Sequence, residues 1–423
     1  MELEGYNTSH RRPQVDRHEG YRAWLCLAGC FFFNVLVWGF AFSFGILQSY
    51  YTEHEPFNRH PEGIAAVGTT ATGLMYLLMP VYFAILQRWP RLKRYFVWAS
   101  LPTIAMGLIG ASFASTVPQL IVCQGVLYAL GGNMMFAPSF TYLDEWFIRR
   151  KGLAIGIMWA GDGTGGIVLP LVLQALLSRY GFRATLRAVA VAMVLMLAPL
   201  SIFFKPRLPI PAESAPRPID TGFLQTPLFW ALQAFNIAQG MGYFLPSNNL
   251  PSYAQSLGLS AELGSLTLIM VNVASALGCV LVGTLCDRFD VLNVLVILSV
   301  GATTAILAVW GLASSATPLF VFSLFYGLTA GAYSCSWGGM AKDIRRQSIT
   351  ADTNIVFSFL AAGRGIGAVI SGPLSEALTR SQVGNATRVR FAYDSDYRSL
   401  VIFAGCTAMA GGCSWLVRRA GFI

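Results

Sequence analysis

Two charged residues of opposite sign stand inside long apolar stretches of this sequence. Asp162 lies in the run AGDGTGG (160–166), and Arg364 lies in the run AGRGIGA (362–368). A charge at the centre of a bilayer costs at least about 2.5–3.5 kcal/mol, so it usually faces a cavity or a partner. Arg364 could therefore bind an anion, with Asp162 as its counter-charge or as a titrating group. The alternative is that neighbouring helices satisfy both charges for purely structural reasons.

Other residue types that carry chemistry are not arranged for it. The glycine runs around Asp162 and Arg364 neither follow a strand nor open a soluble helix, so they indicate close helix packing rather than a phosphate loop. All histidines precede or closely follow the first apolar stretch, and the cysteines form no CxxC motif. We therefore expect no enzyme, no catalytic residue, no cofactor and no metal site. The histidines are His10, His18, His54 and His60.

The composition defines the solvent in which these residues act. Of 423 residues, 55% are apolar and 12% are charged, against about 25% charged in soluble proteins. The mean hydropathy is +0.57. The net charge of +9 comes from short basic runs between apolar stretches, which is typical of a membrane protein and argues against nucleic-acid binding. We therefore expect the chain to lie in a lipid bilayer.

The apolar stretches are regular in length, and each is close to the roughly 20 residues that cross a membrane as a helix. They predict an all-α integral membrane protein with twelve transmembrane helices in two six-helix halves. The expected spans are 23–47, 63–86, 96–114, 118–142, 153–177, 186–204, 227–249, 263–285, 292–313, 317–340, 353–377 and 398–417.

The polar segments between the spans predict domain limits and orientation. Lysine and arginine number 20 on one side and 8 on the other, so the positive-inside rule puts both termini in the cytosol. The first expected span is preceded by a polar tail, and no cleaved signal peptide is expected. In chain order we expect a cytosolic tail (1–22), a first half (23–204), a proline-rich cytosolic linker (205–225), a second half (226–418) and a cytosolic end (419–423). Asn385 lies in a sequon on the outer side and could be glycosylated.

An internal repeat relates the two halves. The runs around Asp162 and Arg364 are 202 residues apart, and at nearly the same offset Tyr128 corresponds to Tyr326. Equivalent helices six spans apart have parallel orientation, as in transporters whose halves enclose a substrate site near the middle of the bilayer.

Several motifs resemble the major facilitator superfamily, in particular its monocarboxylate porter branch of the fungal type. They are EGYRAW (19–24), WG (38–39) with SFG (43–45), YLDEWF (142–147) with RRKGLA (149–154), and a set in the eighth span and the cytoplasmic turn after it: Asn272, Ser275, Gly278, Gly283, Asp287 and Arg288. The resemblance runs from about residue 19 to residue 419. It implies the superfamily fold and a secondary active transporter working by alternating access.

The resemblance also has departures. Animal monocarboxylate carriers place a lysine in the first helix and an aspartate and an arginine in the eighth for anion binding and proton coupling. The resemblance places Phe42, Ser275 and Cys279 at these positions, so the lactate-plus-proton chemistry does not transfer. The expected substrate is an organic acid or a larger amphipathic metabolite. Loss of the cationic first-helix residue, together with a cavity rich in Trp, Tyr and Asn candidates, favours export of a secondary metabolite. Proton-coupled uptake of a small monocarboxylate and a non-transporting nutrient sensor are the alternatives.

Two further groups of residues are candidates for the transport cycle. Polar and aromatic residues on the first, fourth, seventh and tenth spans could line the cavity, although packing or interhelical hydrogen bonding is an equal alternative for each. These are Asn34, Trp38, Asn133, Asn236, Gln239, Asn248, Tyr333 and Trp337. The stretch PSNNLP (246–251) is expected to unwind or to end the seventh helix. Charged residues of the inner face could form a gate or could only orient the helices: Asp144, Glu145, Arg149, Arg150, Lys151, Asp287 and Arg288. The partners we expect are a small molecule, protons and lipid, and the chain is expected to be a monomer in the cell membrane.

Overall fold

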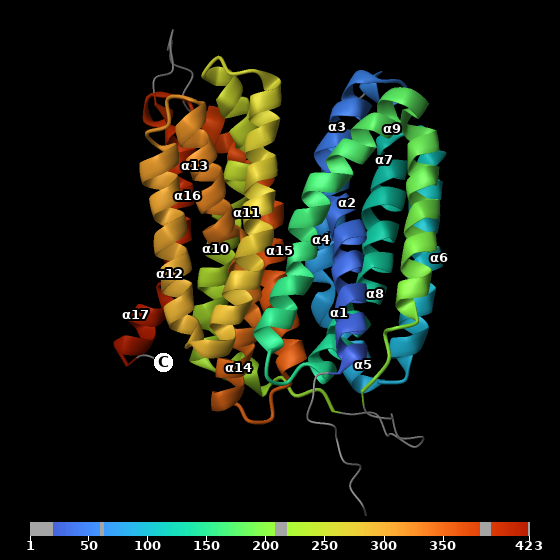
Figure 1. Cartoon of the computed structure of the whole chain (residues 1–423), viewed down its shortest axis with the longest axis vertical. Coiled ribbons are helices and arrows are strands. Elements are labelled where there is room, and N and C mark those ends of the chain that lie inside the picture. The colour runs from blue at the N-terminus through green and yellow to red at the C-terminus, as the bar shows by residue number, and fades with distance from the viewer. Residues whose placement is uncertain (1–19, 60–62, 208–217, 381–390, 422–423) are drawn as a thin grey trace, which may run out of the picture.

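The computed structural model describes residues 20–59, 63–207, 218–380 and 391–421, and all the regular elements within these ranges are helices. The helices form two bundles that stand side by side, one from α1–α9 and one from α10–α17 (Figure 1). The first bundle contains α1 (Tyr21–Phe33), α2 (Gly39–Phe42), α3 (Phe44–Glu53), α4 (Ile64–Leu77), α5 (Met79–Arg88), α6 (Leu92–Ser112), α7 (Val117–Leu120), α8 (Tyr128–Trp146) and α9 (Lys151–Ser201).

The second bundle contains α10 (Pro227–Ser256), α11 (Ala261–Arg288), α12 (Val291–Thr304), α13 (Ala316–Tyr326), α14 (Trp337–Gln347), α15 (Thr353–Arg380), α16 (Arg398–Ala410) and α17 (Ser414–Arg419). Short π-helical or 3-10 turns join several of these helices into longer rods, such as η1 (Asn34–Trp38) between α1 and α2 and η7 (Tyr333–Ser336) before α14. The expected linker, 205–225, includes residues 208–217, which lie outside the described ranges.

The number of crossings follows from the lengths of these rods. Ten helical segments of the described residues are long and apolar enough to span a membrane. One of them, α9, has 51 residues, about 77 Å at 1.5 Å per residue, far more than one crossing of about 30 Å. It contains two helices that meet at Gly181, where φ is 70°, a conformation that glycine adopts without strain. With α10, a more polar helix of 30 residues, the expected twelve helices are accounted for.

One local expectation is wrong. The helix α10 neither unwinds nor ends at Pro246 or Pro251 but continues through both to Ser256. Within this stretch the Asn249 side chain donates to the Leu245 carbonyl at 2.8 Å and to the Ser375 hydroxyl of α15 at 2.7 Å. Neighbouring helices commonly stabilise a membrane helix that contains proline in this way.

The glycine runs pack helices closely, as their sequence suggests. A Cβ added to Gly161 would lie 2.5 Å from the Phe31 carbonyl oxygen of α1. Its repeat equivalent Gly363 would place a Cβ 2.5 Å from the Gln233 side chain of α10. Each glycine run therefore rests on the first helix of its own half.

The next glycines along the two runs contact the opposite half. A Cβ on Gly163 would lie 2.7 Å from the Asn272 carbonyl of α11, and one on Gly365 would lie 2.6 Å from the Tyr76 Cβ of α4. The repeat tyrosines agree with this symmetry. Tyr128 donates to the Val37 carbonyl at 2.7 Å, and Tyr326 donates to the Tyr243 carbonyl at 2.8 Å. The two halves thus share one packing scheme, and α9 and α15 join them.

Candidate functional site

A cavity with a volume of about 190 Å³ lies between the two halves. Both repeat-equivalent charges line it: Asp162 from α9 in the first half and Arg364 from α15 in the second. The remaining walls are aromatic or carry small polar groups. They comprise Phe42, Tyr76, Trp159, Gly163, Gly166, Pro170, Tyr243, Phe244, Ser247, Asn248, Leu268, Asn272, Ser275, Cys279, Gly331 and Ser334.

Arg364 is held by neutral groups. Its side chain is buried, with 2% of the residue exposed, and Nη1 donates to Gln239 Oε1 of α10 at 2.8 Å. The guanidinium carbon lies 4.0 Å from the Tyr243 ring centroid and 5.5 Å from that of Phe244. Ring faces attract a cation electrostatically without neutralising it. A guanidinium has five N–H donors, so Arg364 keeps both its positive charge and further donors for a ligand.

Asp162 lines the same cavity from the other half. Its Oδ1 atom is buried and has no hydrogen-bond donor among the described residues. Within the ranges that the structure covers, no ion pair joins Asp162 to Arg364, although the two charges are close enough to interact electrostatically. A buried carboxylate oxygen without a donor is costly. The arrangement therefore leaves Asp162 available to a proton or to a donor on a ligand.

The other expected cavity residues divide into two groups. Asn248 lines the cavity, and Gln239 lies behind Arg364 as its hydrogen-bond acceptor. The remaining six are packed away from it. Trp337 Nε1 donates to Asn236 Oδ1 at 2.9 Å, and Asn236 Nδ2 donates to the Leu360 carbonyl at 2.6 Å. Buried with them are Trp38, Asn34, which donates to the Cys30 carbonyl, Asn133, which donates to the Leu74 and Ala129 carbonyls, and Tyr333, which donates to the Gly411 carbonyl.

Several lining residues were not anticipated as cavity residues. Tyr243 and Phe244 follow Gln239 by about one helical turn on α10, so helical spacing from a polar residue was the available signal. Phe42, Ser275 and Cys279, which the resemblance to monocarboxylate carriers aligns with charged residues, all line the cavity. These three aligned positions therefore border the same cavity as Asp162 and Arg364.

An aromatic cluster closes the cavity toward the end of the bundle where α8 ends and α15 begins. Trp159 of the cavity wall lies 5.9 Å from Trp38 and 5.8 Å from Trp337, measured between ring centroids. Beyond it, Phe140 of the first half stacks on Phe357 of the second at 4.1 Å. We call these five residues the aromatic plug. Because its rings come from both halves, any opening at this end must separate them.

At this same end an acid of one half caps a helix of the other. The Asp287 carboxylate, at the end of α11, accepts hydrogen bonds from the Gly152 and Leu153 backbone N–H groups at 2.6 and 2.9 Å. These groups belong to the first turn of α9, where the helix dipole favours a negative charge. We call this contact the inter-half cap. It brings Asp287, an expected gating residue, into contact across the halves.

The other expected gating residues stay within their own half or face outward. Asp144 forms an ion pair with Lys151, and Glu145 forms one with Lys93 at 2.8 Å, all within the first half. Arg149, Arg150 and Arg288 are exposed.

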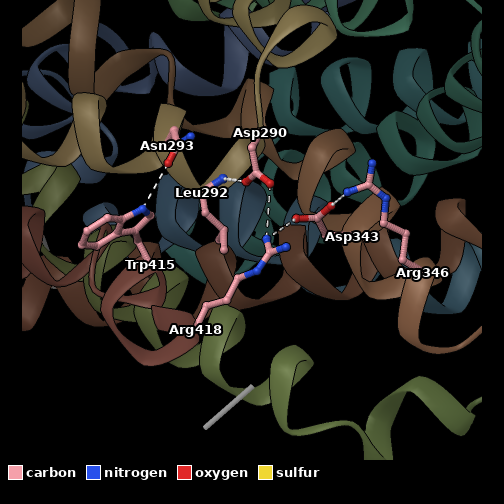
Figure 2. A network of polar contacts seen from close by, with 7 residues as sticks. All are labelled: Asp290, Leu292, Asn293, Asp343, Arg346, Trp415 and Arg418. Atoms are coloured by element: carbon pink, nitrogen blue, oxygen red, sulfur yellow. Dashed lines mark hydrogen bonds and ion pairs between the residues drawn. The ribbon is translucent and has the colours of Figure 1, made fainter. Parts of the chain in front are cut away.

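A network that sequence patterns did not reveal lies at this end of the second half. Arg418 bridges Asp290 at 3.3 Å and Asp343 at 3.6 Å (Figure 2). Arg346 pairs with Asp343 at 2.8 Å. These contacts fasten α17 to α14 and to Asp290, the residue that caps α12, and all of them lie within the second half.

The molecule has two pseudo-symmetric helical halves with a polar cavity between them, and contacts across the halves close this cavity at one end. This arrangement defines a membrane transporter built from two structural repeats. The chain belongs to the Major Facilitator Superfamily, whose profile matches residues 23–351. It is a multi-pass membrane protein of this superfamily.

Curated relatives and a solved structure agree with this assignment. The chain is 25% identical over 410 residues to the MFS transporter asaE of Aspergillus flavus, covering 96% of this chain and 88% of that one. It is 28% identical over 360 residues to the agnestins efflux protein AgnL12 of Paecilomyces divaricatus, covering 84% and 81%. It is 25% identical over 404 residues to the fujikurins efflux protein of Gibberella fujikuroi, covering 95% and 83%. The transporter FucP, solved in the outward conformation, shares the fold with a TM-score of 0.67 at 15% identity, covering 93% of this chain and 98% of FucP.

Proposed function

We propose that this chain exports an organic acid or an amphipathic secondary metabolite by alternating access, as a transporter of the monocarboxylate porter type. The observation that carries the proposal is the buried Arg364, whose charge is directed into an aromatic cavity between the halves. No acid of the described residues forms an ion pair with Arg364, and a buried cation of this kind favours an anionic ligand. Two relatives named as efflux proteins support the direction of transport.

In this proposal Arg364 is the anion anchor, and Asp162 is the group through which protons are coupled to transport. The four histidines lie outside the apolar spans in sequence, which leaves Asp162 as the carboxyl placed in the cavity. Asn248 borders the ligand directly. Gln239 acts through Arg364 by holding one of its N–H groups.

The end of the bundle where α8 ends and α15 begins carries the inter-half cap and the ion pairs described above, and we call it the charged end. The contacts across the halves support a cavity that opens away from this end. The aromatic plug and the inter-half cap join the halves on one side of the cavity. On the other side, Asn248 and Phe42 at the cavity margin are exposed to the surroundings. In the alternate state the Asp287 contact to α9 would break, and the plug would separate.

We further propose that the charged end is cytosolic, that both termini lie there, and that the protein works as a monomer in the cell membrane. Asn385 lies outside the described residues. Its loop would then be external, and treatment with an N-glycosidase should increase the gel mobility of the wild type but not of Asn385→Gln. A single cysteine placed at position 385 should react with an impermeant reagent in intact cells. Labelling only after permeabilisation would contradict this orientation.

The function is tested by comparing metabolites in the medium of cells with and without the protein. Export predicts a compound that is lost from the medium and accumulates in the cells when the protein is absent. Uptake of a monocarboxylate would instead leave an acid unused in the medium. A sensor would change gene expression without changing flux into vesicles. An unchanged metabolite profile together with no flux driven by a pH gradient would contradict transport altogether.

A further inference from the structure

Two ionisable side chains of opposite type, Asp162 and Arg364, line the cavity, and among the described residues no ion pair joins either of them to another group. Arg364 is compensated by the Gln239 oxygen and by the Tyr243 ring face, and Asp162 Oδ1 has no donor among the residues that the structure describes. The two residues come from opposite halves and line one continuous cavity. A ligand that touches both would therefore connect the two moving parts of the molecule.

The charges of the walls restrict the charge of that ligand. With Asp162 ionised the two side chains sum to zero, so a simple anion would satisfy Arg364 but leave a second negative charge beside Asp162. Like charges in a site of low dielectric constant repel strongly. A ligand with one acidic group and one amine matches both walls at once and leaves no charge uncompensated.

The other walls specify the body of the ligand. Phe42, Tyr76, Trp159, Tyr243 and Phe244 line the cavity with aromatic rings. Ring faces favour flat, apolar groups and also attract an ammonium group. A volume of about 190 Å³ suits a body of one or two rings rather than a large macrocycle.

We infer that the cavity recognises an aromatic zwitterion, whose acidic group binds Arg364 and whose ammonium group binds the ionised Asp162. The inference rests on the proposed transport function and names the substrate class for the same site. Because the ligand spans both halves, its binding favours closure of the open end of the cavity.

The same geometry assigns a proton to the empty cavity. When the ammonium group leaves, the Asp162 carboxylate binds one proton, and when the ligand returns that proton is released to the solvent. Ligand and proton then exchange in opposite directions. Among the described residues, the groups that interact electrostatically with Asp162 from the surrounding helices are Arg364 of α15, Tyr76 of α4, Tyr243 of α10, Cys279 of α11 and Cys335 of η7. Asp162 is the carboxyl that lines the cavity, so it provides the proton site.

Three probes that share one skeleton test the substrate class. Phenylalanine has both charged groups, 3-phenylpropanoate lacks the amine, and phenethylamine lacks the carboxylate. Equilibrium dialysis measures their binding to the purified full-length protein in lipid nanodiscs. We expect phenylalanine to bind at least about tenfold more tightly than either relative, a difference of about 1.4 kcal/mol.

Variants assign this preference to residues. Asp162→Asn should reduce the affinity for phenylalanine to the value that the wild type has for 3-phenylpropanoate. Arg364→Gln should reduce the affinity for phenylalanine to the value that the wild type has for phenethylamine. Asp396→Asn removes an exposed carboxylate outside the cavity and should leave all three affinities unchanged.

The pH dependence of the wild type supplies a test that needs no variant. Between about pH 5 and 7 both groups of phenylalanine keep their charges. Binding should weaken toward pH 5 because the proton competes for Asp162. Binding that strengthens toward pH 5, equal binding of 3-phenylpropanoate, or no binding of any probe would overturn the inference. If these binding results fail while cells still export a metabolite through the protein, only the substrate class is wrong. If the metabolite profile is also unchanged by loss of the protein, the proposed function itself is wrong.

Discussion

The inter-half cap gives a prediction whose size follows from the structure. Replacing Asp287 by alanine removes two hydrogen bonds, at 2.6 and 2.9 Å, from the first turn of α9. Bonds to a charged group contribute about 1.5–3 kcal/mol each when buried, but Asp287 is exposed, so solvent screening reduces them. We expect the closed state to lose about 1.5–3 kcal/mol in total. This corresponds to a roughly 10- to 150-fold shift toward opening at this end.

The assay measures access to the cavity from the charged end. Cys335 follows the cavity-lining Ser334 in the chain and is buried, with 1% of the residue exposed. In a background where the other seven of the eight cysteines are replaced, an impermeant maleimide added to inside-out vesicles reaches Cys335 only when this end opens. The labelling rate should rise by the same factor as the population of the open state.

A matched control lies three residues further along the chain. Asp290 bonds to the Leu292 backbone N–H at 2.9 Å and pairs with Arg418 at 3.3 Å, both within the second half. Asp290→Ala should therefore cost about 1 kcal/mol of helix capping without changing the labelling rate. The reasoning is refuted if Asp287→Ala labels within twofold of the wild type, or if the two variants behave alike.

Three further predictions concern packing and pH. A Cβ on Gly156 would lie 2.3 Å from the Cys279 carbonyl oxygen, so Gly156→Leu should lower the melting temperature by forcing α9 and α11 apart, typically at 1–3 kcal/mol; Gly45, with no atom within 4 Å of its added Cβ, should accept alanine without loss. Asn236→Leu leaves the buried Trp337 N–H without its acceptor and removes the side-chain donor to the Leu360 carbonyl, which should lower the stability of the folded state by about 1–3 kcal/mol. A variant as stable as the wild type in a thermal melt would contradict that role. Hydrogen bonds from the Thr350 hydroxyl and the Gly222 N–H lower the pKa of Asp220. The stabilising effect of the Asp220 carboxylate is therefore full above the unfolded pKa of about 3.9 and declines as the pH falls further. In limited proteolysis of the linker, the difference between the wild type and Asp220→Asn should shrink at low pH and not at high pH.

Much of the fold was predictable because its signals are local. Runs of about 20 apolar residues locate the membrane helices, and the shared glycine pattern reveals the repeat. The connection between the fifth and sixth membrane helices was less predictable from the sequence. A single glycine, Gly181, turns the chain there inside one helical stretch, α9, where a polar loop was expected.

The candidate site was predictable only in part. Scarcity of charge in apolar segments singled out Asp162 and Arg364, and both line the cavity. Their surroundings depend on packing between distant segments. Gln239 meets Arg364 across 125 residues, and Asp287 meets Gly152 across 135. Asparagines such as Asn34 and Asn133 have the same composition signal as true lining residues, yet their amide groups bond to backbone carbonyls inside the first half.

The central claim is that Arg364 binds an anionic group of an exported compound in a cavity that alternates between two sides. The direct measurement is the flux, into inside-out vesicles under an imposed pH gradient, of the compound that cells lacking the protein fail to export. The account predicts uptake that needs the gradient and is lost in Arg364→Gln while the purified variant keeps the melting profile of the wild type. Undiminished uptake by Arg364→Gln would contradict it.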